Sequence, residues 1–250
     1  EPLVLLADPL TAGREWRAAR PFLSPALRLV DLDLPTGGGR PGRTASELED
    51  VLAEEIERRD QFPAHLLASS FAAAPALRLA SRRPELVRSL LLHDPIVVLA
   101  ASEARGSPAF GDVRNFFQGG ASDLEAGDLT RAATSFTSAW GGDAQDAHEV
   151  LEAISSSDRS TAQWLTEYGS AASWEVRSHL MEEFLAPTLI VTGELSPALI
   201  RHVTGAVTTR LPNATEVQLP GATHFDPWRH PARFAGVVLT FCLERNVPVT

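Results

Sequence analysis

Cysteine is almost absent from this chain of 250 residues, whose one thiol is Cys242. A single cysteine excludes an intrachain disulfide framework and a metal cluster built from cysteines. Cys242 falls in an apolar stretch at helical spacing, residues 234–243, and is predicted to be a core residue. Cysteine usage therefore favours a reducing compartment, and we expect a cytoplasmic protein.

Lysine is absent, so all 22 basic side chains are arginines, and acidic residues exceed them to give a formal net charge of −10. An acidic chain with no basic patch argues against nucleic acid or an anionic membrane surface as a partner. No apolar run approaches the roughly 20 residues that a membrane-spanning helix needs, and no signal peptide is apparent. No pair of histidines has metal-ligand spacing, and we expect neither a metal nor a cofactor.

Short apolar runs alternate with amphipathic stretches at both ends of the chain. The predicted strands cover residues 3–7, 28–32, 65–68, 89–93, 188–192 and 216–219. The predicted helices between and after them cover 14–20, where Pro21 is expected to end the helix, and 47–59, 71–80, 196–211 and 231–244. Regular alternation of this kind predicts an α/β fold with a mainly parallel sheet flanked by helices.

The alternation stops between residues 96 and 185, where the pattern is helical and no strand is expected. Apolar spacing predicts helices at 129–140, 150–154 and 162–168, and this segment holds about half of the aromatic residues. We interpret it as a helical cap inserted into a core formed by 1–95 and 186–250. Its rings either pack the helices together or line an apolar pocket above the sheet.

The segment 64–80, AHLLASSFAAAPALRLA, joins a predicted strand directly to a predicted helix. A serine at such a bend is typical of a nucleophile elbow, where the sharp turn exposes the hydroxyl and needs small residues two positions before and after it. Ala68 and Ala72 flank Ser70 in this way, where the common form G-x-S-x-G has glycine. The alternative is an ordinary strand–turn–helix in which Ser69 and Ser70 only cap the helix.

Three residues that could carry chemistry each follow a predicted strand. Ser70 lies at the bend, Asp94 follows the next strand, and His224 follows the last one. The carboxyl ends of parallel strands share one edge of a sheet, so these residues are expected to meet there. A serine with a histidine base and a carboxylate that orients the histidine is the arrangement used for nucleophilic catalysis.

The sequence resembles the α/β-hydrolase fold superfamily over almost its whole length, with the two N-terminal antiparallel strands of the usual pattern missing or trimmed. The similarity lies in LVLLADPLTAGREW, DLDLPTGGGR, the elbow, LLLHDP, PTLIVTGELSP and LPGATHFDPWRHPARF. The resemblance implies that Ser70 is the nucleophile and His224 the base. Members most often carry the acid where this chain has Ser196, so the resemblance assigns Asp94, used by other members, with Glu194 as the fallback.

Acyl transfer also needs two N–H groups that bind the developing oxyanion. Phe71 would supply one, while the loop expected to supply the other reads Ala7-Asp8-Pro9, and proline has no N–H. Asp8 would oppose a negative charge, although a small shift would bring the N–H of Leu10 into place. The predicted oxyanion and substrate pocket comprises Phe71, Asp8, Pro9, Leu10, Ser69, Phe136, Trp140, Trp164 and Phe225.

Two functions of different kinds follow, both acting on a small apolar organic substrate. The first is hydrolysis of an ester, thioester or lactone by Ser70, His224 and Asp94. The second keeps His224 and Asp94 as a general base without a covalent step, as in cofactor-free oxygenases, lyases or cyclases of bacterial secondary metabolism. A non-catalytic ligand receptor is the least favoured interpretation, and the sequence leaves a homodimer open.

Overall fold

The computed structural model describes residues 1–6, 8, 11, 13–32, 45–59, 62–99, 121–155 and 175–244. Its main sheet has six strands in the order β2-β1-β3-β4-β7-β8, and every neighbouring pair is parallel. This confirms the predicted α/β class. The strands are β1 (Pro2–Leu6), β2 (Arg28–Leu32), β3 (Ala64–Ser69), β4 (Val87–His93), β7 (Thr188–Gly193) and β8 (Ala214–Leu219).

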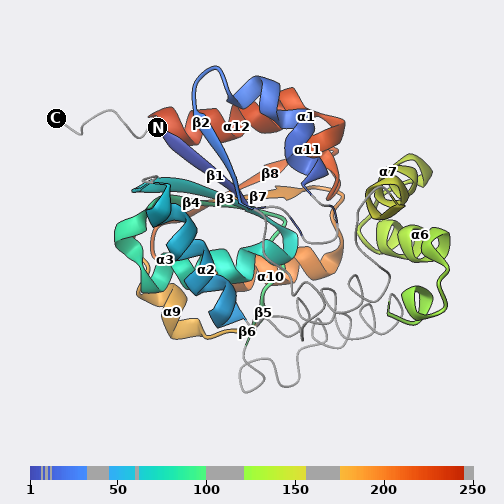
Figure 1. Ribbon diagram of the computed structural model, residues 1–250, viewed down its shortest axis with the longest axis horizontal. Helices are drawn as coiled ribbons and strands as arrows, with labels where there is room; N and C mark the ends of the chain where they lie inside the picture. The colour runs from blue at the N-terminus through green and yellow to red at the C-terminus, as the bar shows by residue number, and fades with distance from the viewer. Residues whose placement is uncertain are drawn as a thin grey trace.

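Helices cover both faces of this sheet (Figure 1). One face carries α1 (Arg14–Leu23), α11 (Asp226–Arg229) and α12 (Pro231–Glu244). The other carries α2 (Ala45–Arg58), α3 (Ala73–Arg82), α9 (Ser178–Glu182) and α10 (Ala198–Thr208). Because both faces are covered, the inner strands read as continuous apolar runs rather than as alternating ones.

The core is divided by the sheet into two layers, and successive side chains of a strand enter opposite layers. In β1, Val4 and Leu6 join the layer under α2, α3 and α10, whereas Leu3 and Leu5 join the layer under α1 and α12. All four are at most 1% exposed. This two-sided burial holds the strand ends in fixed register, and that register positions the residues described below.

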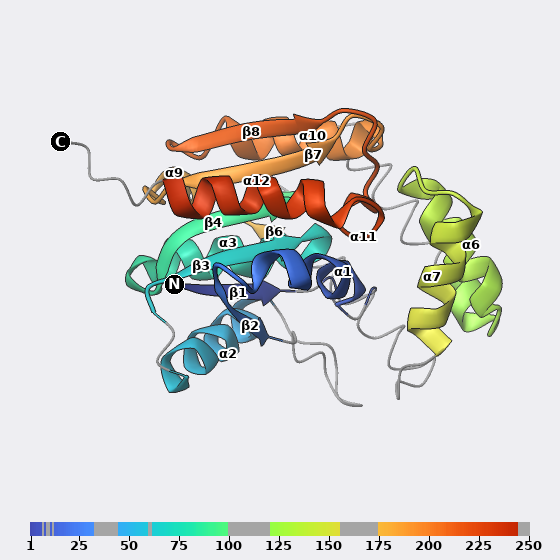
Figure 2. The same ribbon diagram turned by 90° about the horizontal axis from the view of Figure 1, so that it is seen from above.

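Two helices of the predicted cap, α6 (Leu129–Ala139) and α7 (Ala144–Ser155), lie beyond one end of the sheet (Figures 1 and 2). The predicted helix at 162–168 lies outside the described residues. The expectation that the segment holds no strand is wrong, because β5 (Val98–Leu99) pairs in parallel with β6 (Glu175–Val176). Runs of two residues are too short to show a period, so backbone pairing rather than sequence pattern makes them strands.

The expectation that Pro21 ends the first helix is also wrong, since α1 continues to Leu23 with Pro21 inside it. Proline lacks the backbone N–H that a helix residue donates to the carbonyl four positions earlier, so α1 has one hydrogen bond fewer. Pro21 lies on the exposed side, while Leu23 is fully buried against the α12 layer. Burial of Leu23 offsets the lost bond, and the helix gains its last turn.

Candidate active site

The chain turns sharply at Ser70, between β3 and α3. A single 3-10 turn, Ser70–Ala72, joins the two elements, and Ser70 has a φ of 53°. A serine in this left-handed region is strained, and such strain persists where the surrounding structure enforces it. Ala68 and Ala72 are fully buried on either side, as the need for small neighbours predicts. The strand–turn–helix expected from the sequence is therefore present.

Neither serine of the turn caps the helix with its side chain, which removes the capping alternative. The Ser70 side chain is 0% exposed, and its Oγ has no hydrogen-bond partner among the described residues. Its backbone is fixed by a 3.0 Å bond from the Ile96 N–H to the Ser70 carbonyl. A buried hydroxyl left without a partner is costly in a fold and points to a role other than stability.

Asp94 and His224 are brought together by the structure, as predicted. His224 Nδ1 lies 3.0 Å from Asp94 Oδ2, and both side chains are buried. Asp94 follows β4 directly with a φ of 39°. Ser69 pairs with His93 in the sheet register, so Ser70 and Asp94 leave neighbouring strands at the same level. Neighbouring strands are about 4.8 Å apart, so the backbones of Ser70 and Asp94 lie close together, whereas Ser70 Oγ makes no hydrogen bond to His224.

Asp94 is held as a carboxylate by three donors. Besides His224, it accepts hydrogen bonds from Ser196 Oγ at 2.6 Å and from the Gly193 N–H at 3.2 Å. Burial by itself raises the pKa of Asp94, but the His224 hydrogen bond and the nearby imidazoles outweigh it and lower the pKa below the ordinary 3.8. An ionised Asp94 orients the Nδ1–H of His224 toward itself, which leaves Nε2 as the basic nitrogen.

The fallback acid, Glu194, is not placed to orient His224. Its Oε2 accepts the Gly221 N–H at 2.7 Å, and its side chain is exposed. Ser196 was not assigned a role from the sequence, yet its hydroxyl binds Asp94. The resemblance noted in the sequence offered a signal, because it aligns Ser196 with the position at which the acid is most often expected.

The imidazole of His93 packs against that of His224. The two rings stack with centroids 5.5 Å apart, and His93 Nδ1 lies 3.0 Å from Ser69 Oγ. Burial lowers the pKa of His93 to about 4, so it is neutral at physiological pH. The hydroxyl of Ser69, which is predicted as a pocket residue, makes this contact with His93. Ser69 thus holds the His93 ring, which in turn packs against the His224 ring.

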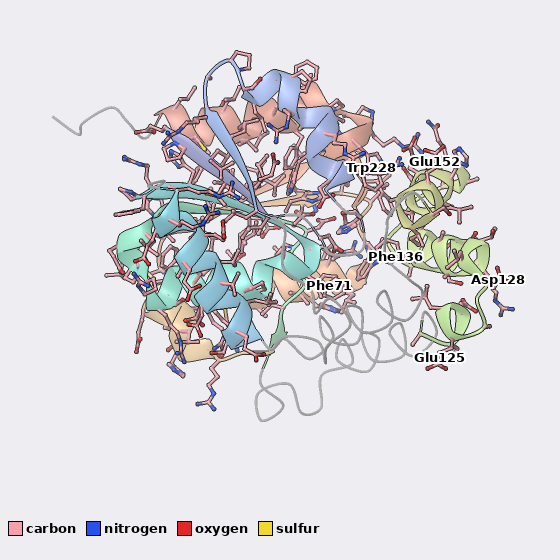
Figure 3. All side chains as sticks on the ribbon, in the orientation of Figure 1. Phe71, Glu125, Asp128, Phe136, Glu152 and Trp228 are labelled. Carbon is pink, nitrogen blue, oxygen red and sulfur yellow. The ribbon has the colours of Figure 1, made fainter. Side chains whose placement is uncertain are left out.

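Aromatic rings from the cap and the core converge on His224. The Trp140 centroid lies 5.3 Å from that of His224, and Phe136 contacts both Trp140 and Phe225 at 6.0 and 6.4 Å. Phe71 completes the group, 6.3 Å from Trp140. Figure 3 shows Phe71 on the core and Phe136 on α6, on the two sides of the cap–core junction. We name these four rings (Phe71, Phe136, Trp140 and Phe225) the aromatic cluster.

Three of the predicted pocket residues, Pro9, Leu10 and Trp164, lie outside the described residues. Asp8 is described, and its side chain reaches the elbow: the Phe71 N–H donates to Asp8 Oδ2 at 3.5 Å. The carboxylate of Asp8 therefore lies at the N–H predicted to bind an oxyanion, where its charge would oppose one. The N–H expected to bind an oxyanion already faces a carboxylate oxygen.

Glu15 on α1 supports the loop that carries Asp8. Its Oε1 accepts the Asp8 N–H at 2.8 Å, and its Oε2 accepts the Thr11 hydroxyl. Burial, with a smaller contribution from the charge of Asp8, raises the pKa of Glu15 from 4.5 to about 7, against the effect of the Thr11 hydrogen bond. Glu15 therefore exchanges its proton close to neutral pH.

Replacing Glu15 by glutamine is expected to stabilise the fold at pH 8 and to change little at pH 4.5. Because the pKa of Glu15 is higher in the folded than in the unfolded state, the fold loses stability as the pH rises from the unfolded pKa near 4.5 through the folded pKa of about 7. A shift of this size corresponds to about 3 kcal/mol. Urea unfolding at the two pH values measures it, with Glu149→Gln, an exposed partner of Arg14, as the control. An equal response of both variants to pH would contradict the assignment.

A polar cavity of about 320 Å³ opens at the cap–core junction, close to His224 in sequence. It is lined by Asp143, Asp146, Thr223, Asp226, Arg229 and His230, among others. Arg229 bridges the two parts through Asp146, at 2.6 Å from Nε to Oδ1.

Within the described ranges, no group of three or more His, Cys, Asp or Glu side chains is placed to hold a metal ion. None of the helices described there is long and apolar enough to span a membrane.

Solved structures resemble this fold over almost the whole chain, although sequence comparisons find no match. No family model and no curated protein matches the sequence. A bromoperoxidase from Bacillus anthracis has a TM-score of 0.77 at 16% identity, over 97% of this chain and 91% of the other. A thermophilic esterase from Thermogutta terrifontis has a TM-score of 0.76 at 19% sequence identity, and the match covers 97% of this chain and 89% of the esterase. A haloalkane dehalogenase variant from Bradyrhizobium elkanii has a TM-score of 0.70 at 18% sequence identity, and the match covers 96% of this chain and 88% of the dehalogenase.

Proposed function

Because this chain has the α/β-hydrolase fold, we propose that it is an enzyme that hydrolyses a small apolar ester, thioester or lactone through Ser70, His224 and Asp94. The observation that carries the proposal is the 3.0 Å contact between His224 Nδ1 and Asp94 beside the strained turn at Ser70. Strain at a buried residue whose hydroxyl has no partner in the described structure is expected of a nucleophile.

The proposed reaction begins when Ser70 Oγ attacks the carbonyl carbon of the substrate. His224 Nε2 takes the hydroxyl proton, and Asp94 balances the charge of the imidazolium. As the tetrahedral intermediate collapses, His224 returns that proton to the departing alcohol, thiol or hydroxyl. Water then releases the acyl group from Ser70 by the same two proton transfers, which restores the free serine.

The aromatic cluster supports an apolar substrate. Its four rings come from α6, from Trp140 directly after that helix and from the core, and all are at most 7% exposed. The Trp140 ring contacts that of His224, so the surroundings of the proposed base are aromatic on this side. Aromatic walls with a few polar groups are the usual lining of small-molecule sites.

A second candidate function is favoured by one observation, the hydrogen bond from the Phe71 N–H to Asp8. A carboxylate at this N–H opposes an oxyanion, whereas it does not hinder a base. The alternative is therefore a non-hydrolytic enzyme in which His224 and Asp94 abstract a proton from the substrate and Ser70 acts as a hydrogen-bond donor.

Labelling with a fluorophosphonate separates the two functions. Hydrolysis through Ser70 predicts a stoichiometric adduct by intact mass, carried by the peptide that contains Ser70 and absent from Ser70→Ala. His224→Ala is expected to slow labelling strongly, because the base that activates the hydroxyl is lost. A folded wild-type protein that takes no label and hydrolyses neither p-nitrophenyl butyrate nor p-nitrophenyl 3-hydroxybutyrate would overturn the proposal in favour of the second function.

A further inference from the structure

The Asp8 carboxylate lies where an oxygen of a bound substrate is expected. An oxyanion held by the N–H that follows the nucleophile lies about 2.7–3.1 Å from the donor nitrogen. The Phe71 N–H points to Asp8 Oδ2, 3.5 Å from its nitrogen. Asp8 is 1% exposed, so bulk water does not screen its charge from this position. An incoming oxygen therefore meets a carboxylate oxygen next to it.

The backbone of Asp8 is anchored on both sides. Its N–H donates to Glu15 at 2.8 Å, and its carbonyl accepts from the Thr11 N–H at 3.2 Å and the Thr11 hydroxyl at 3.1 Å. These contacts do not involve the carboxylate. A substitution at position 8 therefore changes the group that faces the elbow while these backbone anchors are retained.

Two oxygens at hydrogen-bond distance need a proton between them. A plain carbonyl brings no proton and gains negative charge during attack, so an ionised Asp8 opposes it. A hydroxyl or N–H group brings its own proton, donates to Asp8, and leaves the Phe71 N–H for the carbonyl. The charge of Asp8 is also felt at Glu15, where, after burial, it helps to raise the pKa to about 7.

We propose that Asp8 is a specificity-determining residue that selects substrates with a hydroxyl or N–H donor beside the reacting carbonyl and disfavours plain esters. The corresponding substrate class is a hydroxyacyl ester, thioester or lactone. This inference rests on the proposed function, because it takes the Phe71 N–H as the place where the reacting carbonyl binds.

A matched pair of esters tests the selection. The wild type is expected to hydrolyse p-nitrophenyl 3-hydroxybutyrate with a kcat/KM about tenfold or more above that for p-nitrophenyl butyrate. Asp8→Asn replaces the carboxylate by an isosteric amide that donates an N–H. In this variant kcat/KM for the plain ester is expected to rise on the order of a hundredfold, and the preference to disappear. Glu194→Gln, an exposed carboxylate bound to Gly221, is expected to keep the wild-type ratio.

Binding separates failure of this inference from failure of hydrolysis. Dissociation constants of 3-hydroxybutyramide and butyramide, from NMR titration, need no turnover. Tighter binding of the hydroxylated amide by the wild type, lost in Asp8→Asn, supports the inference even if no ester is cleaved. An unchanged preference in Asp8→Asn, in either assay, overturns it while leaving Ser70-dependent hydrolysis intact.

Discussion

Replacing Asp94 by asparagine is expected to lower kcat/KM for ester hydrolysis by about four orders of magnitude. The carboxylate accepts from His224, Ser196 and Gly193 at once, and no neutral side chain can accept from all three with both of its atoms. The amide nitrogen faces the Gly193 N–H in one orientation and the donors of His224 and Ser196 in the other, and in the second it presents a donor to His224. His224 is then held in the wrong tautomer, or not held at all.

Steady-state kinetics of Asp94→Asn, with unfolding measured in parallel, give the result, and Glu194→Gln is the matched control. Glu194 binds Gly221 rather than His224, so its variant is expected to retain wild-type rates. The double variant Asp94→Asn with Ser196→Asp returns a carboxylate from the neighbouring strand end, where Ser196 Oγ lies 2.6 Å from Asp94. It is expected to recover at least about tenfold over the single variant. Equal losses in Asp94→Asn and Glu194→Gln would contradict the assignment of the acid.

The six main strands could be predicted because burial on both faces leaves a plain signal in the sequence. The strand 28–32 is confirmed to the residue, as is the closing helix at 231–244. The turn at Ser70 was also predictable, since a sharp strand-to-helix bend admits only small neighbours, and alanines stand at both positions. Features enforced by dense local packing were thus visible in local sequence.

What the sequence did not show depends on pairing between distant segments. The β5–β6 pair joins runs of two residues that lie more than 70 positions apart, too short for any periodicity. The hydroxyl of Ser196 acquires its role only because β4 and β7 are neighbours, so that Asp94 comes within its reach. The Asp8 side chain could be aligned near the elbow, but its contact with the Phe71 N–H depends on how the loop after β1 packs against the turn at Ser70.

The largest loss of activity is expected for Ser70→Ala, with kcat/KM for ester hydrolysis lower by about six orders of magnitude. The same change is expected to stabilise the fold by about 1–2 kcal/mol, because a buried hydroxyl without a hydrogen-bond partner in the described structure is removed. Opposite effects on activity and stability at one atom are the signature of a residue kept for chemistry rather than for folding.

The adjacent serine provides the control. Ser69 is equally buried, but its hydroxyl is bonded to His93 at 3.0 Å, so Ser69→Ala is expected to lose about 1 kcal/mol of stability and only a small part of the activity. Ester kinetics and thermal unfolding of the two variants under the same conditions make the comparison. A Ser70→Ala protein that stays within about tenfold of the wild-type rate would remove Ser70 as the nucleophile. Catalysis would then be assigned to His224 and Asp94 acting as a base, because those two groups are joined by a hydrogen bond that the serine does not share.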